Sequence, residues 1–386
     1  MNAARKALHA WIAALLRRPP HAVAVWDLGV RLFHWALVLV VTAEALTGFF
    51  ASRSGLAVHL WAGGLLAVLI VWRLIWGLLG STHARFRNFQ YGPGEAIAHA
   101  RAVLNRTARR YIGHNPLGSA MVYAMLVVLV LIIVTGTAAL GGMLKQGPLA
   151  ATLQFTTGAT LLGLHNFLAG LFVIMIGVHL AGVAFETWRE RENLVGAMLT
   201  GAKEAGADPA PPVRARPRLA LIVAAVVVAA TSYGTLRLAA RPAIGVPPAR
   251  LDASYAKECG DCHFAYPPSI APAATWSAIM AHLDQHFGED ASLPADTVAK
   301  LAAYLATNSA EHWNTLAAVR LAGSFDRANP LRITGSGLWR RMHGRIPAAT
   351  FASKLVGGRG QCSACHADAV SGMFAPQNIA IPEPAE

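Results

Sequence analysis

The chain has 386 residues, of which 55% are apolar and only 14% are charged, and its formal net charge is +13. An ordinary soluble domain carries about 25% charged residues, so the composition argues against a purely soluble globular protein. Nucleic-acid binding is also disfavoured, because residues 241–386 carry 12 basic and 12 acidic residues, and the whole excess lies among the apolar runs of residues 1–240.

The chain begins with a basic segment and continues into long apolar stretches. Residues 1–20 contain a short apolar run that ends at Arg-Arg-Pro-Pro without a small-residue cleavage pattern. We interpret them as a cytoplasmic surface segment rather than a signal peptide. Five later stretches are apolar over about 20 residues, the length that crosses a hydrocarbon core of about 30 Å. These predicted transmembrane helices are residues 30–50, 58–79, 119–141, 160–184 and 218–238.

Lys and Arg residues outside these spans predict the orientation of the chain. Residues 1–31, 80–119 and 186–218 together contain 17 of them, whereas the alternate loops contain only Arg53 and Lys145. Basic loops favour the cytoplasm, so we expect a cytoplasmic N-terminus in a bacterial inner membrane and, after five spans, a periplasmic C-terminal part. The predicted regions are a cytoplasmic surface segment (1–20), a transmembrane bundle (21–200), a cytoplasmic linker with the fifth transmembrane helix (201–240) and a periplasmic domain (241–386).

Histidines inside the predicted spans indicate buried cofactors. An ionisable side chain in hydrocarbon is costly, so such residues are usually functional. His165 and His179 are 14 residues apart, 40° short of four full turns, so both rings are expected on one helix face, about 21 Å apart along the axis. Two haems stacked across a bilayer need such a separation. The four intramembrane histidines are His34, His59, His165 and His179.

The depths of these histidines predict their pairing. The first span runs outward and the second and fourth run inward, so His59 and His165 share the outer depth, and His34 and His179 share the inner depth. We therefore predict an outer and an inner haem b, each held by one pair. Four unrelated interhelical hydrogen bonds are the alternative interpretation.

All four cysteines lie in the C-terminal part as two C-x-x-C-H motifs. Residues 259–263 read Cys-Gly-Asp-Cys-His, and residues 362–366 read Cys-Ser-Ala-Cys-His. This pattern is the attachment signature of haem c, in which two thiols bind the vinyl groups and the histidine binds the iron. A disulfide, a thioredoxin-like pair or a zinc site are the alternatives. The predicted thioether residues are Cys259, Cys262, Cys362 and Cys365, and the proximal iron ligands are His263 and His366.

The second axial ligands of these haems are less clear from spacing. His286 lies 23 residues after His263, and His343 lies 23 residues before His366, which favours these two without deciding between the candidates. Imidazole ligands would lower the haem potential relative to a thioether, because they favour Fe(III). The candidates are His282, His286, His312, His343, Met280, Met342 and Met373.

The apolar half resembles the bacterial cytochrome b561 and Ni/Fe-hydrogenase b-type cytochrome family. The resemblance covers about residues 20–200 and implies a four-helix dihaem b bundle that exchanges electrons with quinone, such as ubiquinone or menaquinone. The fifth span departs from this family, and we expect it to export and tether the C-terminal domain. The matching stretches are Arg31-Leu-Phe-His-Trp, His59-Leu-Trp-Ala-Gly, Tyr111-Ile-Gly-His-Asn-Pro-Leu-Gly, His165 and His179.

The C-terminal part resembles the dihaem cytochrome c domain family. The resemblance covers about residues 250–382 and implies two bis-histidine haems, with His286 and His343 as the second ligands. The matching stretches are Cys259–His263, His286-Phe-Gly-Glu-Asp-Ala, His343-Gly-Arg-Ile-Pro and Cys362–His366.

Three charged residues near the predicted b haems have two interpretations each. Glu44 is either a quinol proton acceptor or a carboxylate that reaches the membrane interface. Arg31 and Arg73 either pair with haem propionates or a quinone oxygen, or extend to the interface.

The sequence therefore predicts an all-α membrane electron carrier with two b haems and two c haems. It would pass electrons between the quinone pool and a periplasmic donor or acceptor protein, with no nucleic-acid partner and no assigned catalytic residue. A quinol oxidoreductase activity is left open. The alternatives are a membrane-anchor subunit of a periplasmic oxidoreductase such as a hydrogenase, and a haem-based gas or redox sensor.

Overall fold

The computed structural model describes residues 22–50, 55–204, 214–325 and 331–382. The predicted surface segment at residues 1–20 lies outside these ranges. Most of the described residues are helical, which confirms the all-α prediction.

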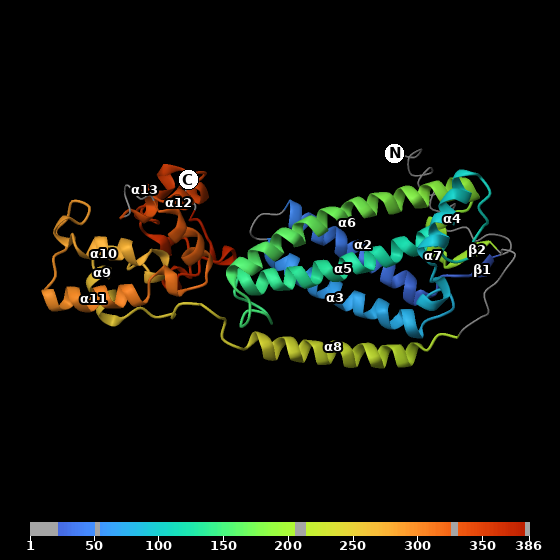
Figure 1. The fold of residues 1–386 in the computed structure, drawn as a ribbon, viewed down its shortest axis with the longest axis horizontal. Coiled ribbons are helices and arrows are strands. Elements are labelled where there is room, and N and C mark those ends of the chain that lie inside the picture. Colours follow the sequence, from blue (N-terminus) through green and yellow to red (C-terminus); the bar gives the residue numbers. More distant parts are fainter. Residues whose placement is uncertain (1–21, 51–54, 205–213, 326–330, 383–386) are drawn as a thin grey trace, which may run out of the picture. The chain divides into compact units, whose positions relative to one another are not determined.

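Five helices are long and apolar enough to cross a membrane (Figure 1). They agree with the five predicted spans in number and position, and each begins one to five residues before the predicted start. Helices of this kind satisfy every backbone hydrogen bond internally, as a hydrocarbon environment requires. They are α2 (Leu28–Phe49), α3 (Gly55–Leu79), α5 (Pro116–Met143), α6 (Phe155–Glu190) and α8 (Pro217–Ala239).

The start of α2 is tied to the end of α3 by the side chain of Asp27. Asp27 caps α2 by accepting from the Val30 amide (2.8 Å). The same carboxylate accepts from the Trp76 indole (2.9 Å) and the Ser81 hydroxyl (2.5 Å). Gly29 permits this contact, because a Cβ there would lie 2.5 Å from the Trp76 ring. Asp27 therefore holds the N-terminus of α2 against the C-terminus of α3.

Short elements connect the long helices. Strands β1 (Ala22–Ala24) and β2 (Ala202–Glu204) form an antiparallel pair in which Ala22 lies opposite Glu204. The sequence did not reveal this pair, because three residues are too few to show alternation. The other connecting elements are α4 (Pro93–Leu104), α7 (Leu194–Thr200) and the short helical turn η1 (Phe86–Phe89).

The C-terminal part contains short helices around an apolar core. Ile270, Leu301 and Leu305 are almost completely buried there, and Tyr255 and Trp276 pack with them. Its helices are α9 (Ala253–Gly260), α10 (Ala273–Met280), α11 (Ala295–Thr307), α12 (Gly337–His343) and α13 (Ala348–Ala352). Its short helical turns are η2 (Pro268–Ile270), η3 (Leu283–Gln285), η4 (Ala310–His312), η5 (Ala317–Leu321), η6 (Ala322–Ser324), η7 (Ile333–Gly335), η8 (Cys362–Ala364), η9 (Ala369–Ser371) and η10 (Pro376–Asn378).

The chain divides into two compact units, and each unit is built from two segments that are separated in the sequence. One unit combines the described residues up to Gly136 with Gly163–Gly234, and the other combines Thr137–Leu162 with the described residues from Thr235 onward. Within the second unit, the side chain of Asn314 accepts from the Lys145 ammonium (3.2 Å) and from the Phe155 amide. The connection between α5 and α6 is thus part of the C-terminal unit.

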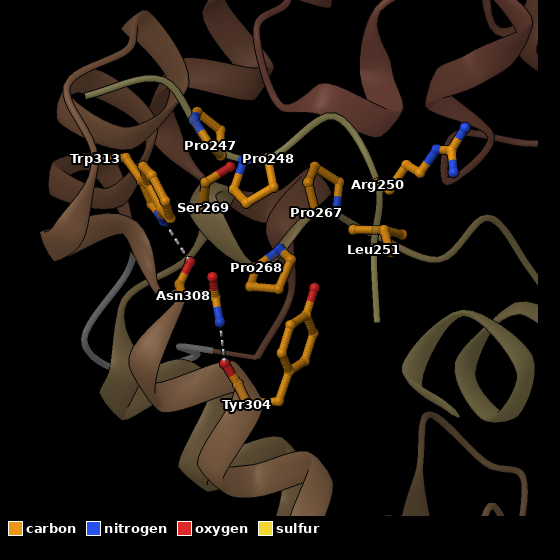
Figure 2. A pocket seen from close by; sticks show the side chains of 10 residues that line it. All are labelled: Pro247, Pro248, Arg250, Leu251, Pro267, Pro268, Ser269, Tyr304, Asn308 and Trp313. Carbon is orange, nitrogen blue, oxygen red and sulfur yellow. Dashed lines mark hydrogen bonds between the residues drawn. The ribbon is translucent and has the colours of Figure 1, made fainter. Parts of the chain in front are cut away.

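The linker after α8 packs against α11 of the C-terminal unit. Figure 2 shows the small pocket that they line, with Pro247 and Pro248 on one side and Tyr304 on the other. The Trp313 indole donates to the Asn308 carbonyl (2.8 Å), and the Asn308 amide donates to the Tyr304 carbonyl (2.9 Å). None of the described residues that line this pocket is a histidine or cysteine, so it is a packing feature of the linker rather than a candidate haem site.

Candidate haem sites

His59 of α3 and His165 of α6 face each other in the bundle. Their ring centroids are 6.2 Å apart, and the ring planes are 84° apart. Two metal–nitrogen bonds of about 2 Å, with roughly 1 Å from nitrogen to centroid in each ring, add to about 6 Å. The spacing therefore fits a single iron bound by both imidazoles.

The Nδ1 atom of His59 is held by two residues of α2. Glu44 Oε2 lies 2.6 Å from it, and Thr47 Oγ1 lies 3.1 Å from it. The Thr47 hydroxyl donates to the Ala43 carbonyl (2.7 Å), so its oxygen is free to accept from the ring. These contacts leave Nε2 as the nitrogen available to a metal. Both interpretations of Glu44 made from the sequence missed this contact, whose only signal was the similar depth of the two residues.

The ring of His165 is positioned by α5. Its Nδ1 lies 3.0 Å from the Ile132 carbonyl oxygen and 3.4 Å from Thr135 Oγ1. Gly136 makes room for the ring, because a Cβ there would lie 3.0 Å from His165 Cε1. His165 therefore also presents Nε2 away from its hydrogen-bonded side.

His34 of α2 and His179 of α6 form the second bundle pair. The pair lies on the same two helices as predicted, α2 and α6, without the direct ring contact that joins His59 to His165. The ring of His34 packs edge-on against Trp35, with centroids 5.2 Å apart. Its Nδ1 atom is buried and forms no hydrogen bond with any described residue. A buried polar atom without a partner is rare in proteins, and it distinguishes His34 from His59, whose Nδ1 contacts Glu44 and Thr47.

Two arginines flank the bundle pairs without reaching them. Arg73 is only 4% exposed, and its guanidinium donates to the Ala84 carbonyl (3.2 Å) and packs over the Phe86 ring at 4.5 Å. The guanidinium of Arg73 is therefore enclosed by the chain at the end of α3, and both interpretations of this residue remain predictions. Arg31 donates to the Leu199 carbonyl, and its Nε is buried without a hydrogen bond to any described residue.

His263 and His286 face each other in the C-terminal unit. Their ring centroids are 6.1 Å apart and their planes are 25° apart, and His263 Nδ1 lies 2.8 Å from the Phe264 carbonyl. His286 lies at the start of a tight turn in which Phe287 and Gly288 have φ values of +57° and +100°. A positive φ is uncommon for a residue other than glycine, so the turn that presents His286 is locally strained.

His343 and His366 form the other C-terminal pair. Their ring centroids are 6.0 Å apart, and the planes are 62° apart. His343 ends α12, where its Nδ1 lies 2.9 Å from the Trp339 carbonyl and its ring stacks on the Trp339 indole at 4.5 Å. The His366 amide donates to the Cys362 carbonyl (2.9 Å), which closes the turn of the C-x-x-C-H motif.

The four cysteines are unpaired thiols, of which Cys262 is exposed and the other three are half-buried. Burial raises the pKa of the Cys259 thiol to about 11 and the pKa of the Cys362 thiol to about 11. A thioredoxin-like pair requires the opposite, a thiol whose pKa is lowered by its surroundings. The environment therefore disfavours a redox-active dithiol and fits thiols held beside an apolar macrocycle.

The remaining candidate ligands lie in other surroundings. Met280 belongs to the apolar core of the C-terminal unit. His282 is exposed, and its Nδ1 lies 3.0 Å from the Ala278 carbonyl of the preceding helix α10. Met342 is 52% exposed. Of the candidates, the structure brings His286 and His343 to the two C-x-x-C-H histidines.

Two tyrosines that the sequence analysis did not single out connect the two motifs. The Tyr266 hydroxyl donates to the Gly360 carbonyl (3.0 Å), two residues before Cys362. The Tyr255 hydroxyl donates to the Tyr266 carbonyl (2.6 Å). Burial raises the pKa of both phenols, so they remain neutral donors. No sequence motif marks these contacts, because they join segments far apart in the chain.

Five apolar helices and paired histidines beside C-x-x-C-H motifs define a haem-binding membrane protein of the electron-transfer class. Comparison with known proteins identifies the families. Residues 25–201 belong to the prokaryotic cytochrome b561 family, and residues 255–374 belong to the dihaem cytochrome c family. These families imply haem b in the first region and haem c in the second.

Individual relatives cover each region separately. Probable Ni/Fe-hydrogenase B-type cytochrome subunits of Cupriavidus necator and Azotobacter chroococcum are 27% and 26% identical, over 47% and 48% of this chain and 86% and 89% of those proteins. The solved dihaem cytochrome c of Shewanella baltica OS155 is 34% identical over 35% of this chain and 94% of that one, with a TM-score of 0.28. A solved dihaem cytochrome c of Rhodobacter sphaeroides is 35% identical over 32% and 96%, with a TM-score of 0.28.

Proposed function

We propose that this protein passes electrons between the quinone pool and a periplasmic redox partner by means of two b haems and two c haems. The observation that carries the proposal is the recurrence of facing histidines, with three pairs of ring centroids 6.0 to 6.2 Å apart. Bis-histidine iron porphyrins supply reversible one-electron couples without an open coordination position. This feature favours electron transfer over gas sensing.

In the bundle, the proposed iron ligands come from three helices. His59 and His165 would hold one haem b between α3 and α6, and His34 and His179 would hold the other between α2 and α6. Each pair would thereby join two helices, because both imidazoles must reach the same iron. His165 and His179 on one helix would keep the two sites at a fixed separation.

In the C-terminal unit, the proposed attachment is covalent. Cys259 and Cys262 would bind one macrocycle and Cys362 and Cys365 the other, each through thioether bonds. The proposed iron ligands are His263 with His286, and His366 with His343. The hydrogen bonds of His263 and His343 to backbone carbonyls orient their rings, which leaves Nε2 for the iron.

The proposed placement follows the distribution of basic residues. We place residues 1–20 and the connection 201–216 in the cytoplasm, the bundle and α8 in the bacterial inner membrane, and residues 241–386 in the periplasm. Residues 1–31, 80–119 and 186–218, on the proposed cytoplasmic side, contain 17 Lys and Arg residues against two in the alternate loops, which supports this orientation.

The relatives named as hydrogenase cytochrome subunits suggest a membrane anchor for a periplasmic oxidoreductase as the other candidate. The dihaem C-terminal region gives this chain a redox outlet of its own, so the broader electron-transfer role is favoured.

The test is a redox titration of the purified full-length protein, combined with a haem count and reduction by a quinol analogue. We expect two acid-extractable b haems, two haems that remain covalently bound, and reduction of both kinds by the quinol. A preparation that contains the protein without extractable haem b would contradict the proposal. Full haem content with no reduction by quinol and no oxidation by quinone would contradict the quinone link alone.

A further inference from the structure

The proposed iron ligand His59 contacts a carboxylate through Nδ1, the ring nitrogen that faces away from the proposed iron. Glu44 Oε2 lies 2.6 Å from His59 Nδ1, and the Glu44 side chain is only 15% exposed. Three other proposed ligands have backbone carbonyls in this position, at 2.8 to 3.0 Å: His165, His263 and His343. Among the described residues, no other carboxylate lies within salt-bridge distance of a proposed ligand.

The contact is a built feature of the hairpin between α2 and α3. Glu44, Thr47 and Gly48 are spaced so that they share one face of α2. Thr47 Oγ1 lies 3.1 Å from His59 Nδ1, and a Cβ at Gly48 would lie 3.4 Å from His59 Cε1. On α3, one turn after His59, a Cβ at Gly63 would lie 3.4 Å from Glu44 Oε1. Small residues on both helices therefore leave room for the ring and for the carboxylate.

A carboxylate that accepts from a metal-bound imidazole changes the metal. It fixes the orientation of the ring and raises the basicity of the ligating nitrogen, which favours the more highly charged oxidised iron. The interaction is stronger in a low-dielectric interior than in water. His34 of the other bundle pair shows no hydrogen bond at Nδ1 within the described residues. The two bundle sites therefore differ in the group that supports the ligand.

We propose that Glu44 is a positioning residue for His59 and that it selectively lowers the reduction potential of the haem at the His59–His165 pair. This inference rests on the proposed function, which assigns a haem b to that pair. Its consequence is an order of potentials within the bundle, in which the His34–His179 site is the more easily reduced. A reducing equivalent shared by the two sites would then reside mainly at His34–His179.

The test is a spectroscopic redox titration of the full-length protein in detergent. In Glu44→Gln, the amide retains the size of the side chain but removes its charge. We expect the potential of one b haem to rise, with the equilibrium constant for its reduction about tenfold larger, equal to about 59 mV for a one-electron couple. The other three potentials should not move. The shifted haem is assigned by repeating the titration in His34→Ala, in which the only remaining haem b should be the one at His59–His165.

Two variants on the same helix are the controls. Thr47→Val removes the second acceptor at His59 Nδ1 and should shift the same haem in the same direction by less. Thr42→Val is the matched control, because its hydroxyl bonds only the Val38 carbonyl (2.7 Å) of its own helix, and it should leave all potentials unchanged. If Glu44→Gln fails to retain the haem, Glu44→Asp decides, since it keeps a carboxylate: a retained haem whose potential stays below that of the other b haem supports the proposal.

Three results would overturn it. They are an unchanged potential in Glu44→Gln, an equal shift of both b haems, or a Glu44→Asp haem with a potential no lower than that of the other b haem. These results differ from a failure of the proposed function, in which the wild-type protein would itself lack extractable haem b.

Discussion

The bundle and the C-terminal unit bring histidines together by different means. In the bundle, His59 and His165 lie far apart in the sequence, on two different long helices, and the tertiary fold brings their rings together. In the C-terminal unit, His263 and His286 are joined by a short stretch of chain, and two cysteines stand beside the proximal histidine. The proposed ligands in the bundle are thus part of the tertiary structure, whereas those in the C-terminal unit are mainly a local property of the chain.

The two kinds of site should respond differently to the loss of one histidine. A non-covalent haem held by two imidazoles loses half of its protein bonds when one histidine is removed. A haem held by two thioethers and a proximal histidine remains attached when the distal ligand is lost. Loss of one histidine should therefore remove the haem from a bundle site, whereas loss of the distal histidine should leave a C-terminal haem attached with a changed reduction potential.

Removal of one bundle histidine should have the largest effect. In His165→Leu, we expect loss of the haem at His59–His165, so that extractable haem b falls to half while covalent haem c is unchanged. The measurement is a pyridine haemochrome count on purified protein. His99→Leu is the control, since His99 is buried in the same unit but has no proposed ligand role. Retention of both b haems in His165→Leu would show that the bundle does not depend on this ligand.

A change of the distal ligand in the C-terminal unit should alter the potential and not the haem content. In His286→Met, we expect both c haems to remain bound on a denaturing gel stained for haem. The potential of one should rise on the order of 0.1 V, a fraction of the roughly 0.8 V that axial ligands span. His282→Met is the matched control, because His282 is exposed and, among the described residues, its ring contacts only the Ala278 carbonyl at the end of α10. Loss of the haem from His286→Met, or no shift at all, would break the contrast with the bundle.

A histidine enclosed in the unit that contains the bundle predicts that this unit loses stability in acid. His114, before α5, packs between Trp26 and Phe89 at 4.8 and 4.4 Å, and burial, followed by the nearby Arg73, lowers its pKa to about 3. The imidazole of the unfolded chain titrates near pH 6.5. The neutral His114 ring therefore contributes fully to the free energy of unfolding above that pH, and this contribution is lost as the pH falls toward 3. At pH 5 the loss is about 2 kcal/mol, from 1.36 kcal/mol per pKa unit.

Thermal melting of the bundle helices at pH 7.5 and pH 5 checks this expectation. The wild-type melting temperature should fall on acidification, and His114→Phe should lose most of that dependence because the replacement cannot be protonated. His282→Phe, at an exposed position, should behave as the wild type does. An equal fall in all three proteins would assign the acid sensitivity to other groups.

The features that the sequence predicted are those that depend on local pattern. The five spans follow from apolar runs, and the paired faces of His165 and His179 follow from helix periodicity. The contact of Glu44 with His59 does not, because it depends on the register between α2 and α3. The same reason applies to the β1–β2 pair and to the bond from Tyr266 to Gly360, each of which joins distant segments. Motifs and helix periodicity could be predicted from the sequence, whereas the residues that support the proposed ligands could be identified only from the packed structure.

The ring orientations give the finest distinction between the two units. The planes of His59 and His165 are 84° apart, whereas those of His263 and His286 are 25° apart. Crossed imidazoles leave the two iron orbitals that bond to the ring π systems nearly equal in energy, while nearly parallel imidazoles separate them. In the oxidised low-spin protein, the haem at His59–His165 should therefore have a larger maximal g value than the haem at His263–His286.

Electron paramagnetic resonance at low temperature, on the wild-type protein and on two variants, checks this expectation. The signal with the larger maximal g should disappear in His165→Leu, and the more rhombic signal should change in His286→Met. If the signal lost from His165→Leu were the more rhombic one, the angle between the His59 and His165 rings would differ from the 84° described. The spectrum would then correct the geometry at the bundle site while leaving the C-terminal pairs, which depend on local chain, in place.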